Sequence, residues 1–168
     1  NFGLLYGAGP ATLAKQAIAQ YGLELSPQES SQMVQDFRNA YPRLYSWQQQ
    51  VGQATTTSSF TAIGRRRQLV GFNDRYTTRI KSELQGTAGD ITKLALVMLW
   101  SALEQRPQGE AYLIATVHDE IVMEVKEEFA ELYSSLLKCS MEDAGNRIIT
   151  SVPIVADVAA GKTWADAK

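Results

Sequence analysis

The tripeptide His118-Asp119-Glu120 has the residue types best suited to catalysis in this sequence. It separates two apolar runs of strand-like composition, residues 112–117 and 121–125. Two adjacent carboxylates between apolar strands do not serve a core, because burying an unpaired charge is costly. Mg²⁺ binds one or two carboxylates and completes its shell with water and phosphate oxygens. Asp119 and Glu120 are therefore candidate Mg²⁺ ligands, although for the tripeptide alone an exposed acidic turn is the simpler explanation.

Cations gather in a second segment, residues 65–81. It holds six cations and one acid, with Phe72 and Tyr76 among them, and Gln85 follows closely. Arg and Lys contact phosphates without reading sequence, while neighbouring aromatic and amide groups can contact bases and sugars. The pattern indicates a nucleic-acid-binding surface, although a solvated face explains each cation taken singly. The six cations are Arg65, Arg66, Arg67, Arg75, Arg79 and Lys81.

The first residues place aromatic side chains at helical spacing. Phe2 and Tyr6 are four residues apart and share one face of a helix. Such pairs more often belong to a core, but Gly3 and Gly7 beside them leave room for a flat group to stack. Phe2 and Tyr6 are therefore candidate stacking residues. The sequence also begins without Met or a leading polar segment, so we expect it to start at a cut end.

Length and composition indicate a protein that folds as one domain. The 168 residues are 45% hydrophobic and 20% charged, which excludes disordered and low-complexity classes. The net charge of −2 conceals an asymmetry, because residues 104–143 hold ten acids and three cations. One Cys and one His form neither an intramolecular disulfide nor a zinc site, which favours a reducing intracellular setting. No apolar run is long enough for a bilayer, so no membrane contact is expected.

Helices dominate the first part of the sequence. A helix is expected between Gly9 and Gly22, and Ser26-Pro27-Gln28-Glu29 is a capping box that begins a second. Pro42 ends the second helix and begins a third, which reaches Val51.

Strands enter in the second part. The expected fold is α+β, with a helical portion followed by a small antiparallel sheet and a buried central helix. Thr87 is the expected cap of that central helix, and the basic residues at 64–67 form the expected tip of a hairpin. The expected elements are strands at 60–63 and 68–70, the central helix at 87–103, the strands on either side of His118, an acidic helix at 127–144 and a strand at 152–158.

These motifs, in this order, resemble the DNA polymerase I family (family A). Asn1-Phe2-Gly3-Leu4-Leu5-Tyr6-Gly7 is similar to the C-terminal end of its motif B, and Val117-His118-Asp119-Glu120 resembles its motif C. The likeness covers essentially the whole chain. Intervening and terminal family segments are matched by Gly64-Arg65-Arg66-Arg67, by Gln85-Gly86-Thr87-Ala88-Gly89-Asp90 with Lys93-Leu94-Ala95, and by Gly161-Lys162-Thr163-Trp164.

The resemblance implies a role for each matched residue. Phe2 and Tyr6 would face the incoming nucleotide and the templating base. Asp119 would be the carboxylate that binds catalytic Mg²⁺, with Glu120 assisting and His118 contacting the primer end. Gln85 would contact DNA near the primer–template junction. Where the family usually has Arg and Asn, this chain has Thr77 and Lys81, so those contacts would fall to Arg79 and Lys81.

The resemblance also implies domains, partners and missing parts. Residues 1–58 would be a helical fingers portion and residues 59–168 a palm portion. The partners would be primer–template DNA, deoxynucleoside triphosphates and the N-terminal part of the polymerase, which would supply motif A and the thumb. The chain alone is expected to be inactive, and exposed apolar surface could cause self-association. The implied location is cytoplasmic and nucleoid-associated.

Two other functions fit the same residues. A non-catalytic nucleic-acid-binding module would keep the basic surface, and its acidic turn would bind nothing. A metal-dependent phosphoesterase using Asp119 and Glu120 ranks last, because it needs more ligands than lie around one His. Replacing Asp119 by Ala separates the first two functions, since a binding module would be indifferent to the change.

Overall fold

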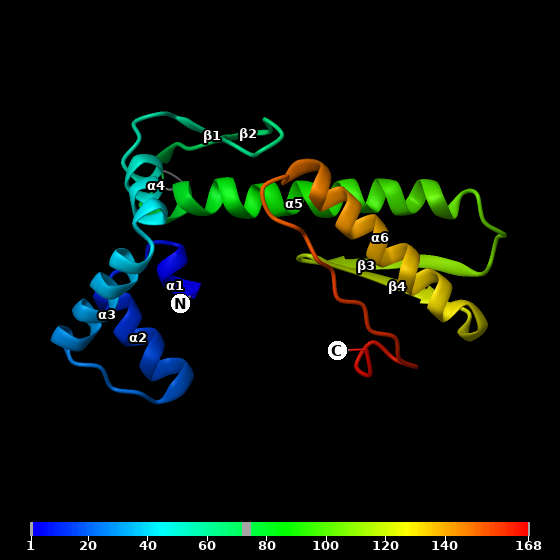
Figure 1. Ribbon diagram of the computed structural model, residues 1–168, viewed down its shortest axis with the longest axis horizontal. Coiled ribbons are helices and arrows are strands. Elements are labelled where there is room, and N and C mark those ends of the chain that lie inside the picture. Colours follow the sequence, from blue (N-terminus) through cyan, green and yellow to red (C-terminus); the bar gives the residue numbers. More distant parts are fainter. Residues whose placement is uncertain (1, 72–74, 168) are drawn as a thin grey trace. The chain divides into compact units, whose positions relative to one another are not determined.

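The computed structural model describes residues 2–71 and 75–167, and the side chain of Phe2 lies outside that description. The chain divides into two compact units, Asn1–Phe60 with Arg65–Leu84, and Thr61–Gly64 with Gln85–Lys168. Helices and two two-stranded antiparallel sheets make up the described elements (Figure 1), which confirms the expected α+β class. Among these residues, no helix is both long and apolar enough to cross a bilayer.

The first unit begins with the expected helices. Gly22 ends the helix Pro10–Tyr21 in a left-handed conformation, with φ of 65°. Ser26 and Glu29 form the expected capping box, and the hydrogen bonds from Ser26 lower the pKa of the Glu29 carboxyl. Three of the helices begin with Pro, namely at Pro10, Pro27 and Pro42, where the missing N–H of Pro loses no helical hydrogen bond. The helices are α1 (Phe2–Leu5), α2 (Pro10–Tyr21), α3 (Pro27–Ala40) and α4 (Pro42–Gly52).

A buried glutamine joins α1 to α4. The Nε2 group of Gln48 donates to the carbonyl oxygens of Leu4, at 3.0 Å, and Leu5, at 2.7 Å. These carbonyls lie at the end of α1, where the Leu4 carbonyl also accepts from the N–H of Gly7 at 3.0 Å. Gln48 is 4% exposed, so the two bonds satisfy polar groups that are shielded from water.

The basic hairpin lies earlier in the chain than expected. Its strands are β1 (Ser58–Phe60) and β2 (Arg66–Gln68), not residues 60–63 and 68–70. Gly64 takes φ of 82° and its N–H bonds to the Thr61 carbonyl, so the turn precedes Arg65. Arg66 and Arg67 therefore lie in a strand and not at the tip.

The long helix also begins earlier than expected. α5 spans Tyr76–Leu103, and Thr87 lies inside it instead of capping it. The residues before Thr87 contain no Pro, and Gly86 lowers helix propensity by only about 1 kcal/mol, so no local signal stops the helix there. The Thr87 hydroxyl instead accepts a 3.0 Å hydrogen bond from the N–H of Ala62.

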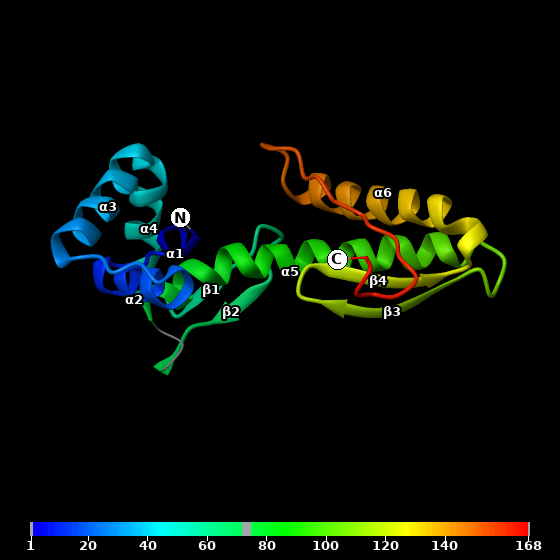
Figure 2. The ribbon, with the colours of Figure 1, turned by 90° about the horizontal axis from the view of Figure 1, so that it is seen from below.

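The core of the second unit lies between α5, a hairpin and α6. The hairpin pairs β3 (Ala111–Val117) with β4 (Glu120–Val125), and α6 spans Ala130–Ile148 after the short 3₁₀ helix Glu127–Phe129. These elements lie side by side in Figures 1 and 2. One face of α5 is buried, whereas Val97 and Trp100 on another are 62% and 57% exposed. The buried core residues are Ala95, Leu99, Ile121 and Ala144.

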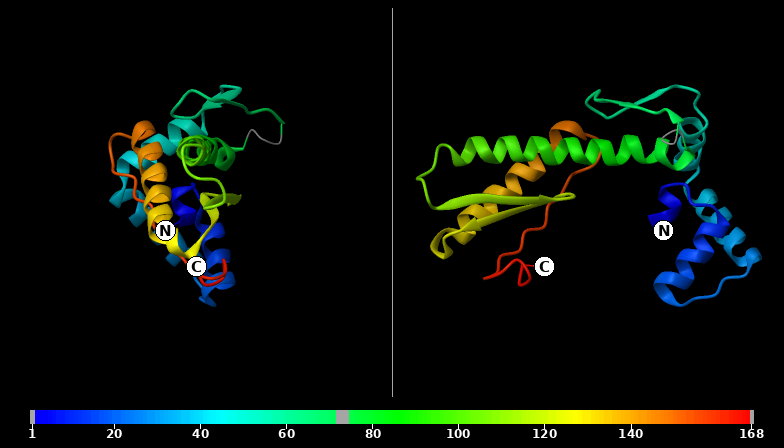
Figure 3. Two further views of the ribbon diagram at one scale, coloured as in Figure 1. Left: turned by 90° about the vertical axis from the view of Figure 1, so that its right-hand side faces the viewer. Right: turned by 180° about the vertical axis from the view of Figure 1, so that it is seen from behind.

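A tyrosine of α6 forms a hydrogen bond with the residue that precedes β3, at the end of the hairpin opposite the turn. In Figure 3, α6 crosses the two strands. The buried Tyr133 hydroxyl donates to Glu110 Oε2 at 2.7 Å. The Glu110 carbonyl accepts from the N–H of Lys126 at 2.9 Å, which closes the hairpin base. The hydrogen bond to Glu110 and burial raise the pKa of Tyr133.

The expected strand at 152–158 is wrong. This segment has no regular secondary structure and pairs with no strand among the described residues. Side chains one helical turn apart on α6 take the place of a sheet partner. Asn146 Oδ1 accepts from the N–H of Ile154 at 2.9 Å, and Glu142 Oε1 accepts from the N–H of Ala156 at 3.1 Å. The alternation of residue types in this segment gave no sign that side chains of α6 would bind it.

Candidate active site

The β3–β4 hairpin presents the acidic tripeptide at its tip. Val117 pairs with Glu120, so His118 and Asp119 form a two-residue loop. All three residues of the tripeptide are exposed. The core holds the two strands in place, because Leu113, Ile121 and Met123 pack in the core with α5 and α6. A rigid base therefore carries two exposed carboxylates into solvent.

His118 adopts a backbone conformation that favours glycine. Its φ is 56°, and it is the one described non-glycine residue with positive φ. The first position of a tight hairpin turn with positive φ is usually Gly, because a β-carbon there costs about 1–2 kcal/mol. Strained residues of this kind concentrate at functional sites, where the surrounding structure holds them.

Replacing His118 by Gly and by Ala should separate strain from side-chain chemistry. Both changes remove the imidazole, but only Gly removes the β-carbon. We expect His118→Gly to be more stable than His118→Ala by about 1 kcal/mol in urea unfolding. Equal stabilities would mean that the left-handed turn stores no strain. If the imidazole contacts the primer end, both variants should weaken that contact by the same factor.

The tip has the donors for a loosely held cation. Asp119 and Glu120 supply oxygen ligands, which suit Mg²⁺, and one or two carboxylates are the usual protein share of a Mg²⁺ site. Within residues 2–71 and 75–167, no group of three or more His, Cys, Asp or Glu side chains could hold a metal ion. The two carboxylates therefore fit a Mg²⁺ ion whose remaining ligands are water molecules or oxygen atoms of a substrate.

The predicted DNA-binding cations differ in exposure. Arg65, Arg66 and Lys81 are exposed, whereas Arg79 is only 5% exposed. The Nε group of Arg66 donates to Ser58 Oγ at 2.8 Å. Burial makes Arg79 the weakest of the predicted DNA contacts, because a phosphate cannot reach a covered guanidinium without a rearrangement.

Tyr6 lies against a lysine that sequence reasoning treated only as a DNA contact. Lys81 Nζ is 5.5 Å from the centroid of the Tyr6 ring, within cation–π range. The prediction for Phe2 falls on a side chain outside the described residues. The pairing of Lys81 with Tyr6 was missed, since no local signal connects residues 75 positions apart.

Tyr76, which the sequence placed among the cations as an aromatic able to contact bases and sugars, packs beside Gly7 and Gly52. Its hydroxyl accepts from Gln49 Nε2 at 3.2 Å, and burial raises its pKa. A β-carbon on Gly7 would lie 2.6 Å from Tyr76 Cε1, and one on Gly52 would overlap the opposite ring edge. Two glycines thus give the ring its space.

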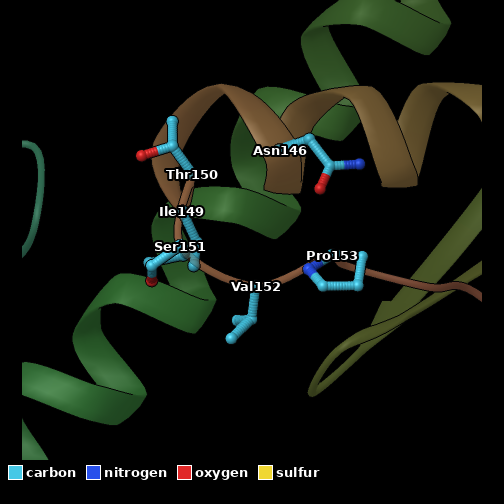
Figure 4. Close-up of a pocket in the computed structure, with 6 residues that line it drawn as sticks. All are labelled: Asn146, Ile149, Thr150, Ser151, Val152 and Pro153. Atoms are coloured by element: carbon cyan, nitrogen blue, oxygen red, sulfur yellow. The ribbon is translucent and has the colours of Figure 1, made fainter.

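The predicted site residues divide between the units. The first unit holds Tyr6, Arg65, Arg66, Arg79 and Lys81, of which Tyr6 and Lys81 are in contact. The second holds the hairpin tip and Gln85, which is exposed on α5. A separate hollow of about 270 Å³ at the end of α6 (Figure 4) contains none of them. Asn146, Ile149, Thr150, Ser151, Val152 and Pro153 line it.

The family of this chain is shown by its similarity to known proteins. Residues 1–166 match DNA polymerase family A. DNA polymerase I of Aquifex aeolicus is 33% identical over 168 residues, covering 98% of this chain and 28% of that protein. The thermostable DNA polymerase I of Thermus filiformis is 32% identical over 178 residues, covering 100% of this chain and 20% of that protein.

A solved structure agrees with the sequence relatives. The POL domain of Pol1 from M. smegmatis, in complex with DNA primer-template and dNTP, superposes with a TM-score of 0.81 and 25% identity. The match covers 99% of this chain and 29% of that one. The chain belongs to DNA polymerase family A, and it spans less than a third of the length of these relatives.

Proposed function

We propose that this chain is the C-terminal part of a template-directed DNA polymerase that adds deoxynucleotides to a primer 3′ end. The observation that carries the proposal is the pair Asp119 and Glu120, exposed at the tip of the β3–β4 hairpin beside the strained His118. Family membership over residues 1–166 supports it. Residues 1–58 would belong to the fingers and residues 59–168 to the palm.

Each matched residue has a part in the proposed reaction. Asp119, assisted by Glu120, would hold Mg²⁺, which when bound stabilises negative charge on the attacking and leaving oxygens of phosphoryl transfer. His118 would contact the primer end. Tyr6 would offer its ring beside the nascent base pair, and its place is steadied by Lys81.

The remaining matched residues would hold the duplex. Gln85 is exposed on α5 and would contact DNA near the primer–template junction. Arg65, Arg66 and Lys81 are exposed cations for the backbone phosphates, to which Arg79 would add its charge. Primer–template DNA and deoxynucleoside triphosphates are therefore the proposed ligands.

We also propose that the chain is inactive by itself. Phosphoryl transfer through two metal ions needs carboxylates on both sides of the ion pair. Among the described residues the acidic side chains form no cluster of three or more ligands. The remaining ligands, and a cover for exposed apolar residues such as Val97 and Trp100, would come from the N-terminal part of the polymerase.

The isolated chain should bind primer–template DNA weakly, with little sequence preference and strong salt dependence. The segment 65–81 carries a net of five positive charges, and each neutralised phosphate adds about −0.9 to the slope of log K against log salt. We expect a slope between about −3 and −5. Anisotropy titrations of labelled DNA at several salt concentrations measure it. Salt-independent binding, or none, would refute the DNA-binding part of the proposal.

A further inference from the structure

The β1–β2 hairpin has an inner face and an outward face. Ser59 pairs with Arg67, and Ser59 is 6% exposed, which marks their common face as the inner one. Leu69, two residues after Arg67, is 1% exposed and continues the inner face. Directly opposed residues in an antiparallel pair project to the same side, so the alternate pairs form the outward face.

The outward face combines an aromatic ring with an arginine. Phe60 pairs with Arg66, and Ser58 pairs with Gln68. Phe60 is 54% exposed, although an aromatic side chain usually gains by burial, and the register places it directly opposite Arg66. The face therefore offers a ring surface, a cation and an amide within one short two-stranded ribbon.

Arg66 is oriented by its neighbour on this face. Its Nε donates to Ser58 Oγ at 2.8 Å, across the strands. This bond restrains the guanidinium through Nε, and the two Nη groups carry four further N–H donors. Fixing the side chain beforehand reduces the entropy lost when an anion binds. Arg65, which precedes β2, is also exposed and adds positive charge, and so does the exposed Arg67, although it projects to the other side of the ribbon.

We infer that the outward face of β1–β2 binds an unpaired stretch of nucleic acid, with a base stacked on Phe60 and a neighbouring phosphate on Arg66. A duplex offers its phosphates to Arg66, but its bases already stack on one another and expose no ring face to Phe60. Single-strand binders combine cations with stacking aromatics in this way. The inference rests on the proposed function and deepens it, since it assigns this hairpin to the unpaired part of the DNA.

A tryptophan at position 60 reports the stack directly. In Phe60→Trp, a dT oligonucleotide should quench the added emission, measured as the difference from the parent protein, which carries Trp47, Trp100 and Trp164. A blunt duplex of the same length should leave this difference signal unchanged. Quenching of equal size by both would overturn the inference, because it would show contact without stacking.

Affinity measurements separate the ring from the charge. Phe60→Leu keeps an apolar strand residue but no ring, and should weaken binding of the dT oligonucleotide about tenfold while leaving duplex affinity and the salt slope unchanged. Arg66→Gln should weaken the binding of both the dT oligonucleotide and the duplex. It should also reduce the magnitude of the slope of log K against log salt by about one. Tyr21→Leu, which removes a 74% exposed aromatic from α2, is the matched control and should change neither.

The outcomes distinguish this inference from the proposed function. If duplex binding and its salt slope persist while Phe60→Leu leaves dT affinity unchanged, the inference fails and the proposed function stands. If no DNA binds, both fail. If Phe60→Leu alters the oligomeric state in sedimentation but not dT affinity, the outward face contacts protein and the inference is wrong. Circular dichroism confirms that each variant is folded.

Discussion

Asp119→Ala should reduce primer extension by about 10³-fold or more when this chain is combined with a polymerase N-terminal part. A carboxylate that holds the catalytic ion contributes several kcal/mol to the stabilisation of charge in the transition state, and its removal loses that contribution. Each increase of about 1.36 kcal/mol in activation free energy lowers the rate tenfold. Asp119 is exposed on a turn and supports no core packing, so the loss should occur without loss of stability. Extension by the reconstituted pair on labelled primer–template, with urea unfolding in parallel, measures both.

Asp143→Ala is the control for this change. It removes an exposed acid of the same size from α6, away from the hairpin tip in sequence, and should leave extension unchanged. If the reconstituted pair stays active with Asp119→Ala, the assignment of the tip as motif C is wrong and a non-catalytic nucleic-acid-binding module is favoured. If the isolated wild-type chain extends primers at ordinary enzyme rates, the proposed inactivity of the chain alone is wrong.

Gly52→Ala should destabilise the first unit by about 3 kcal/mol, although Ala is the better helix former. The added β-carbon would overlap Cε2 and Cδ2 of Tyr76. The ring cannot move aside, because a shift away from Gly52 brings it toward Gly7 and strains the bond from Gln49. Overpacking a filled site costs about 1–3 kcal/mol, and here both edges of the ring are confined. Urea unfolding measures the loss.

Two further variants test the cause. Gly89→Ala, inside α5 with nothing within 4 Å of the new β-carbon, should stabilise the protein by up to about 1 kcal/mol. Tyr76→Leu should be destabilising alone, but combined with Gly52→Ala it should cost less than the two changes added together, since the clash is gone. Additive losses would show that Gly52 matters for some reason other than the Tyr76 ring.

Local signals were sufficient where neighbours in sequence make the structure. The capping box of Ser26 and Glu29 is confirmed because both hydrogen bonds lie within three residues. The hairpin around His118 is confirmed because two apolar runs with a short polar break can pair only with each other. Its exposure also follows from composition, since unpaired carboxylates are costly to bury, whereas its role as a cation site stays a prediction.

Local signals failed where a distant partner decides. Thr87 has the residue type of a helix cap, yet it lies inside α5 and bonds to Ala62, 25 positions away. Residues 152–158 alternate like a strand, yet their N–H groups bond to Asn146 and Glu142 of α6. The propensity of a segment indicates which backbone conformation has a low free energy, whereas the elements that pack beside the segment decide its hydrogen-bond partners.

The sequence by itself determined the family, the acidic tip and the positive charge of residues 65–81, because these depend on residue types and short spacings. Only the tertiary structure decided which face of β1–β2 is outward, that Arg79 is covered, and that Lys81 lies on Tyr6. Side-chain alternation means that a shift of one residue exchanges the faces of a strand. The register that settles this depends on the local turn from Thr61 to Gly64 and on the burial of Leu69, and packing decides the second of these.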